Sequence, residues 1–156
     1  MNLLVEWTRP IRLKDATKQN LIYAVDPHKL PDAAGVYVFG RHWGSGFEAL
    51  YVGKGNHICG RVKKQFNNLQ LMQHIRNAKA GKRIVLAGIV ITKPGQQIKR
   101  CLTLVERAMI RYFLSEGHDL VNKQGTRLRR HKIVSSGKHP KQFIPCLMYV
   151  EKAKGK

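Results

Sequence analysis

The chain has 156 residues, of which 43% are hydrophobic, so it is long enough for one globular domain and too apolar for a disordered chain. Lysine and arginine total 29 and aspartate and glutamate total 9, which gives a formal net charge of +20. Because so much like charge repels itself, we expect a polyanionic partner, and nucleic acid is the commonest. Binding of ribosomal RNA or anionic lipid without any chemistry would fit the same charge balance.

Export and membrane insertion are not expected. The apolar run at the N-terminus is interrupted by Glu6 and Arg9, and no small-residue cleavage site follows it. No stretch reaches the roughly 20 apolar residues that a membrane-spanning helix needs. The cysteines, Cys59, Cys101 and Cys146, are odd in number and far apart, which argues against a disulfide framework. We therefore expect a cytoplasmic protein with no membrane partner.

Five β-rich segments predict strands. They are residues 3–7, 35–40, 49–53, 84–92 and 143–150. The second and third predict a hairpin whose tip is a long loop. The fourth is almost continuously apolar, which is typical of a buried central strand. Pro145 favours an edge position for the last strand.

Two segments carry helical spacing. Residues 59–80 have an imperfect apolar stripe that ends at Gly81, and residues 97–116 place their apolar side chains, Tyr112 among them, on one face. Together with the strands, these helices predict an α/β (α+β) fold. We expect a small sandwich in which helices flank a central, mostly antiparallel sheet.

One carboxylate stands out by its isolation. Glu106 is the single acidic residue between Glu48 and Glu116, in a stretch rich in lysine and arginine. A surface salt bridge to Arg107 or Arg111 would explain it and would contribute only ~0–1 kcal/mol. A single carboxylate can also hold Mg²⁺, which takes one or two carboxylates and keeps several waters. On this residue alone, the salt bridge is the simpler interpretation.

Two tyrosines occupy similar places. Tyr37 and Tyr51 lie in short predicted strands, each close to a glycine, so a hairpin could bring both hydroxyls to one side. Aromatic residues are also good strand formers, which would explain both tyrosines without any chemistry. The tyrosines alone therefore do not indicate a site.

The residues in combination resemble a known family. The triplets Gly35-Val36-Tyr37 and Tyr51-Val52-Gly53 are similar to the signature of the GIY-YIG nucleases. The other matching positions, in chain order, are Leu30-Pro31 upstream, Arg61 ten residues after Tyr51, Glu106 in the second long helix and Asn122 in the loop after it. The resemblance implies a nuclease core over residues 30–125. Residues 1–29 would then be an N-terminal extension packed on the core, and residues 126–156 a basic C-terminal extension with a terminal strand and tail.

The resemblance also implies a reaction. The chain would be an endonuclease that hydrolyses phosphodiester bonds, in DNA in preference to RNA, with one Mg²⁺ (or Mn²⁺) on Glu106. The catalytic set would be Tyr37, Tyr51, Arg61, Glu106 and Asn122. Basic residues near this set would contact the nucleic acid: Lys54, Lys63, Lys64, Lys123, Arg127, Arg129 and Arg130. Cutting both strands of a duplex would call for a homodimer.

One position departs from the family pattern. Four residues after Arg61, where the family commonly has tyrosine or histidine, this chain has Gln65. Because glutamine is no general base at ordinary pH, this position favours an alternative, a non-catalytic module that binds nucleic acid and keeps the fold. A third interpretation is a basic structural protein in which the triplets occur by chance and Glu106 is freely replaceable.

Overall fold

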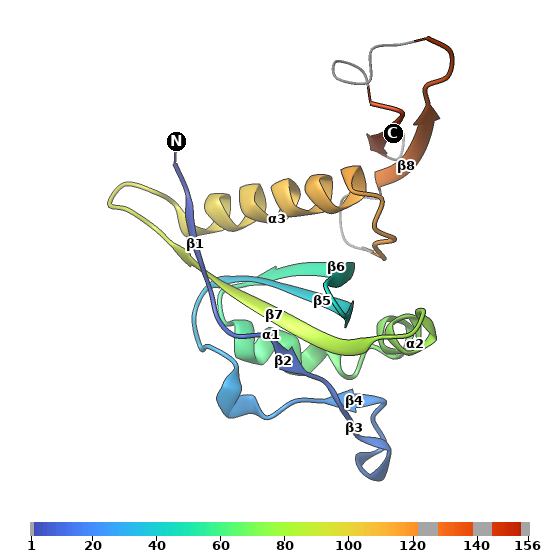
Figure 1. Cartoon of the computed structure of the whole chain (residues 1–156). Helices are drawn as coiled ribbons and strands as arrows, with labels where there is room; N and C mark the ends of the chain where they lie inside the picture. Colours follow the sequence, from blue (N-terminus) through green and yellow to red (C-terminus); the bar gives the residue numbers. More distant parts are fainter. Residues whose placement is uncertain (1, 122–127, 139–144, 154–156) are drawn as a thin grey trace.

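The computed structural model describes residues 2–121, 128–138 and 145–153 (Figure 1). The first part of the chain forms β1 (Leu4–Trp7), β2 (Ile11–Arg12), β3 (Lys14–Asp15), η1 (Thr17–Gln19), β4 (Tyr23–Ala24) and η2 (Pro27–Lys29). The middle forms β5 (Gly35–Trp43), β6 (Gly46–Gly55), α1 (Ile58–Gln65), α2 (Leu69–Asn77), β7 (Lys82–Ile91) and α3 (Ile98–Ser115). The last elements are β8 (Leu128–Val134) and β9 (Leu147–Ala153).

The main sheet is antiparallel throughout its described pairs, as the sequence predicts. Its strand order is β1-β7-β5-β6, and β2 also pairs with β7. The strand over 84–92 is therefore central, as expected, because β7 has neighbours on both sides. Among the described strands, β6 pairs only with β5, so it forms one edge of the sheet.

Helices cover both faces of this sheet. Figure 1 shows α3 on one side and α1 with α2 on the other. Alternation along β5 explains this arrangement, because Tyr37 and Phe39 pack in the core under α1 and α2, while Val36 and Val38 pack under α3. The fold is thus the small α+β domain that the sequence predicts.

The β5–β6 hairpin is longer than predicted. The expectation of a long loop over 41–48 is wrong, because both strands continue to a tight turn at Gly44, which has a positive φ of 49°. Arg41 and Glu48, the first and last residues of the expected loop, instead pair across the hairpin through Nε and Oε1 at 2.9 Å. The register shifts at Phe39/Gly40, opposite Leu50, so Leu50 and Tyr51 both join the core under α1 and α2.

The first long helix is in fact two. Residues 59–80 were expected to form one helix, but α1 ends at Gln65 and α2 begins at Leu69. Asn68 provides the reason, because its side-chain oxygen accepts a hydrogen bond from the backbone N–H of Leu71 at 3.2 Å and caps α2. The helix α3 agrees with prediction, except that Tyr112 is 57% exposed and not part of the core.

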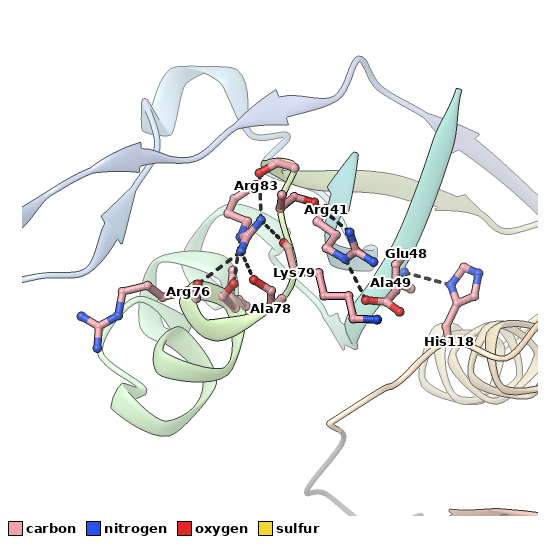
Figure 2. Close-up of polar contacts among 11 residues, drawn as sticks. Arg41, Glu48, Ala49, Arg76, Ala78, Lys79, Arg83 and His118 are labelled. Carbon is pink, nitrogen blue, oxygen red and sulfur yellow. Dashed lines mark hydrogen bonds and ion pairs between the residues drawn. The ribbon is translucent and has the colours of Figure 1, made fainter. Parts of the chain in front are cut away.

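The carboxyl end of α2 is held by one arginine. Figure 2 shows Arg83 of β7 reaching into the turn that follows α2. Its guanidinium donates hydrogen bonds of 2.6–3.2 Å to the backbone carbonyls of Ile75, Arg76, Ala78, Lys79 and Gly81. The carbonyls of Ile75 and Arg76 belong to the last turn of α2, and the other three belong to the turn that follows it. Arg41, beside it, donates to the carbonyl of Ala80 at 2.8 Å.

The C-terminal part adds a separate two-stranded sheet. β8 pairs with β9 in antiparallel register, near the carboxyl end of α3 in Figure 1. No strand was predicted in the basic stretch that contains β8. The last strand begins at Leu147, later than the predicted residue 143, which itself lies outside the described residues. No helix in the described part of the chain is long and apolar enough to cross a membrane.

Candidate active site

The two tyrosines meet on one face of the hairpin. In the β5–β6 register, Tyr37 pairs with Gly53 and Tyr51 pairs with Phe39, so both aromatic rings point toward α1. Their ring centroids are 6.2 Å apart. Tyr37 is fully buried at 0% exposure, whereas Tyr51 is 8% exposed. The two tyrosines thus lie on the same side of the hairpin, as the sequence suggested. Of the two, only Tyr51 has exposed surface.

Gln65 joins the two hydroxyls. Its side-chain Nε2 donates to Tyr37 Oη at 2.8 Å and lies 3.4 Å from Tyr51 Oη. Gln65 is the last residue of α1 and is only 7% exposed. The residue that departs from the family pattern is therefore part of the same cluster as the tyrosines.

Two glycines make room for the cluster. A β-carbon on Gly53 would lie 2.3 Å from Cζ and 2.4 Å from Oη of Tyr37, so only glycine lets the phenol lie across β6. A β-carbon on Gly55 would lie 3.1 Å from Cβ of Arg61. Gly55 therefore lets the first turn of α1 pack closely against the end of β6.

Arg61 approaches the tyrosines from α1. It lies in the first turn of that helix, where its backbone N–H donates to the carbonyl of His57 at 3.0 Å. Its side chain is half-buried, and its positive charge lowers the pKa of Tyr37, of Tyr51 and of Glu106. Arg61 is thus electrostatically coupled to all three groups.

Glu106 approaches from α3, on the other face of the sheet. Its Oε1 lies 3.8 Å from Nζ of Lys54 on β6, and Lys54 Nζ also donates to Oγ1 of Thr103 at 2.8 Å. The charge of Glu106 acts on Tyr51, although α1 and α3 cover opposite faces. The edge strand β6 contacts both helices, because its Lys54 reaches Glu106 of α3 and its Gly55 packs against Arg61 of α1, so this edge is the candidate site.

Burial dominates the protonation of this cluster. It raises the pKa of Glu106 above its ordinary value, although Lys54, Arg107 and Arg61 lower it. Burial likewise raises the pKa of Tyr37 and of Tyr51 above 10.0, against hydrogen bonds from Gln65 and the charge of Arg61. A neighbouring cation favours the tyrosinate. Arg61 does act in that direction, but desolvation outweighs it.

Glu106 is the carboxylate of this cluster that could hold a hard divalent cation, beside the ammonium of Lys54. The Glu106 side chain is 17% exposed, and the charge it carries when ionised is poorly solvated, so a cation there would be favoured. The described residues contain no group of three or more His, Cys, Asp or Glu side chains that could hold a metal by themselves. Mg²⁺ is often bound through one or two carboxylates together with water and substrate phosphates, which this arrangement permits.

The remaining predicted residues are less closely placed. Lys63 and Lys64 are exposed on α1. Asn122, Lys123 and Arg127 lie outside the described residues. Arg129 and Arg130 belong to β8, but the positions of their side chains are not described.

The chain approaches the candidate site just before Asn122. The backbone N–H of Val121 donates to the carbonyl of Leu50 at 2.8 Å, so residue 121 lies beside β6. Sequence reasoning missed Thr103, which holds Lys54. Its position three residues before Glu106, on the same side of a helix, was the available signal.

No family model, no curated protein and no solved structure matches this chain. The site is therefore interpreted from its own geometry.

Proposed function

We propose that the protein is a metal-dependent endonuclease that hydrolyses phosphodiester bonds, with DNA as its preferred substrate. One arrangement supports this most strongly: the strand β6 carries Tyr51, packs its Gly55 against Arg61 of α1, and directs Lys54 to Glu106 of α3 at 3.8 Å. A base, a phosphate-binding cation and a metal ligand are the groups that phosphodiester hydrolysis uses. The net charge of +20 supports a polyanionic substrate.

Arg61 and Glu106 have distinct roles in this proposal. Arg61 donates hydrogen bonds to the non-bridging oxygens of the scissile phosphate, for which a planar guanidinium is well suited. Glu106 holds Mg²⁺ or Mn²⁺. The bound cation would neutralise charge at the phosphate and at the departing oxygen.

Tyr51 is the proposed general base. It is the more accessible of the two tyrosines, since Tyr37 has no exposed surface. In the reaction, a water oxygen forms a bond to phosphorus while the phosphorus–O3′ bond breaks. The water proton goes to the phenolate oxygen of Tyr51, and the departing 3′ oxygen takes a proton from solvent. Tyr37 supports Tyr51 and does not touch the substrate.

Further contacts would bind the phosphate backbone. Lys63 and Lys64 are exposed on α1, and Arg107 is exposed beside Glu106. Lys123, Arg127, Arg129 and Arg130 stay predictions of the same kind, as does the supporting role of Asn122. Lys54 is engaged by Thr103 and Glu106, so its more direct role is at the carboxylate. A homodimer would place two such sites on a duplex.

The alternative is a binding module without catalysis, which the glutamine at position 65 favours. Purified protein incubated with plasmid, single-stranded DNA and RNA, each with Mg²⁺, Mn²⁺ or EDTA, separates the two. Metal-dependent cleavage of DNA that is stronger than cleavage of RNA supports the proposal. Tight, salt-dependent binding with no cleavage under any condition would favour the binding module.

A further inference from the structure

Gln65 is the least explained group in the cluster. Apart from the tyrosines, Gln65 and Arg41 are the two polar or charged side chains that are buried in the described part of the chain. A buried amide is costly unless it is hydrogen-bonded. Its Nε2 is directed at Tyr37 Oη and Tyr51 Oη, at 2.8 and 3.4 Å. The amide therefore donates its hydrogen bonds to the two tyrosines and not to solvent.

The direction of these hydrogen bonds matters. An amide NH₂ has two hydrogens to donate, so both phenol oxygens act as acceptors. Donation to an oxygen favours its ionised form, whereas acceptance from a hydroxyl favours the neutral form. The charged and titratable groups that act on Tyr51 are Tyr37, Arg61 and Glu106. Gln65 and the Tyr37 hydroxyl are neutral donors to Tyr51, and of these two only Gln65 cannot titrate.

We propose that Gln65 is a positioning residue, whose buried amide bridges Tyr37 and Tyr51 and holds Tyr51 Oη as an acceptor ready for the water proton. This inference rests on the proposed nuclease function. It deepens that function, because it assigns the departure at position 65 a role in the reaction. The glutamine then supports catalysis, although it first suggested that catalysis had been lost.

Two substitutions of similar shape test whether Gln65 must donate hydrogen bonds to the tyrosines or need only hold them in place. Gln65→Met keeps the length and removes both hydrogens. Gln65→Glu keeps the length and can accept hydrogen bonds from both hydroxyls, but when ionised it cannot donate. If Gln65 were only a tether, Gln65→Glu would cleave like the wild type. If donation matters, both variants lose kcat, by about tenfold for each net hydrogen bond lost in the transition state, while KM stays unchanged.

A second readout does not need activity. The side-chain NH₂ of Gln65 can be assigned in a ¹H–¹⁵N spectrum from its loss in Gln65→Met. We expect this signal to shift in both Tyr37→Phe and Tyr51→Phe, because each removes one acceptor. A signal that responds to neither substitution would overturn the bridge. If a buried glutamate prevents folding of Gln65→Glu, the spectral shifts together with kcat of Gln65→Met still decide whether the bridge exists and whether it matters for cleavage.

The outcomes distinguish this inference from the function on which it rests. Wild-type protein that cleaves nothing contradicts the proposed function, whatever the spectrum shows. Wild-type cleavage together with a folded Gln65→Met variant of unchanged kcat overturns the positioning role and leaves the nuclease intact. A reduced kcat in Gln65→Met and Gln65→Glu, with unchanged KM and the expected spectral shifts, supports the inference.

Discussion

The phenol of Tyr37 lies across Gly53, where a β-carbon would approach its Cζ to 2.3 Å. The second glycine of the paired motif therefore has a physical purpose, which is to let a tyrosine from the neighbouring strand reach the sheet edge. The same phenol receives the Gln65 amide at 2.8 Å. Gly53, Tyr37 and Gln65 thus form one chain of contacts that ends at Tyr51.

Gly53→Ala should therefore disrupt the site. The added methyl group must displace the Tyr37 ring, which has no space to move to, and overpacking of this kind typically costs about 1–3 kcal/mol. We expect a lower melting temperature and a loss of cleavage at saturating substrate. Gly60→Ala is the matched control, because a β-carbon there meets nothing within 4 Å. Since Gly60 lies in α1, that change should stabilise the protein by about 0.5–1 kcal/mol. Equal melting temperatures for Gly53→Ala and wild type would contradict this account of the glycine.

The raised pKa of Glu106 predicts a conflict between stability and function. A carboxyl whose pKa is higher in the folded state stabilises the fold most below its unfolded value of 4.5, and that stability is lost as the pH rises through the folded pKa. Above its folded pKa, the ionised Glu106 therefore destabilises the protein. Glu106→Gln should melt at a higher temperature than wild type at pH 7, and the difference should shrink near pH 4. A variant that melts several degrees lower at pH 7 would contradict the direction of the shift.

The pKa of Tyr51 predicts how cleavage depends on pH. Burial raises this pKa above 10.0, so the basic form of Tyr51 is scarce at neutral pH and grows as the pH rises. We expect kcat to increase by about tenfold per pH unit between pH 7 and 9, where the phenolate remains the minor form. Tyr51→Phe should remove this increase with pH. Tyr37→Phe should lower kcat at every pH, but kcat should still rise with pH as in the wild type. A wild-type profile that is flat across this range would exclude Tyr51 as the base.

Arg83 provides a prediction about stability alone. Its guanidinium satisfies five backbone carbonyls at the end of α2, which Figure 2 shows. Hydrogen bonds from a charged donor contribute about 1.5–3 kcal/mol, so Arg83→Ala should lower the free energy of unfolding by at least that amount. Chemical denaturation measures this change. Arg83→Lys should recover only part of the loss, since an ammonium has three donors and no planar fork. Full recovery by lysine would show that charge, and not the fork, holds the turn.

The sequence predicted the parts of the fold that depend on periodic patterns. The apolar run of β7 and the amphipathic face of α3 were predictable because burial repeats along them. The hairpin tip was not, because Arg41 and Glu48 look like loop residues until they pair across two strands. The break between α1 and α2 depends on the single cap at Asn68, a local signal that a weak apolar stripe obscured.

The sequence could predict which residues belong to the candidate site, but not how these residues are arranged. Motif spacing selected Tyr37, Tyr51, Arg61 and Glu106, but no spacing rule shows that the helices α1 and α3 both contact the edge strand β6. Gln65 was visible only as a departure, because its role depends on the burial of two hydroxyls from distant strands. The balance that sets the pKa of Tyr51 also requires three-dimensional structure, because the sequence shows the cations near this tyrosine and not its burial.

The most direct test of the central claim is single-turnover cleavage of a labelled DNA duplex by wild type and by Glu106→Gln, with binding measured in parallel. The account predicts Mg²⁺-dependent cleavage by wild type that EDTA abolishes. It predicts no cleavage by Glu106→Gln, although that variant folds and still binds the duplex. Cleavage by Glu106→Gln at the wild-type rate, or binding by both proteins without any cleavage, would contradict a metal-dependent nuclease site at Glu106.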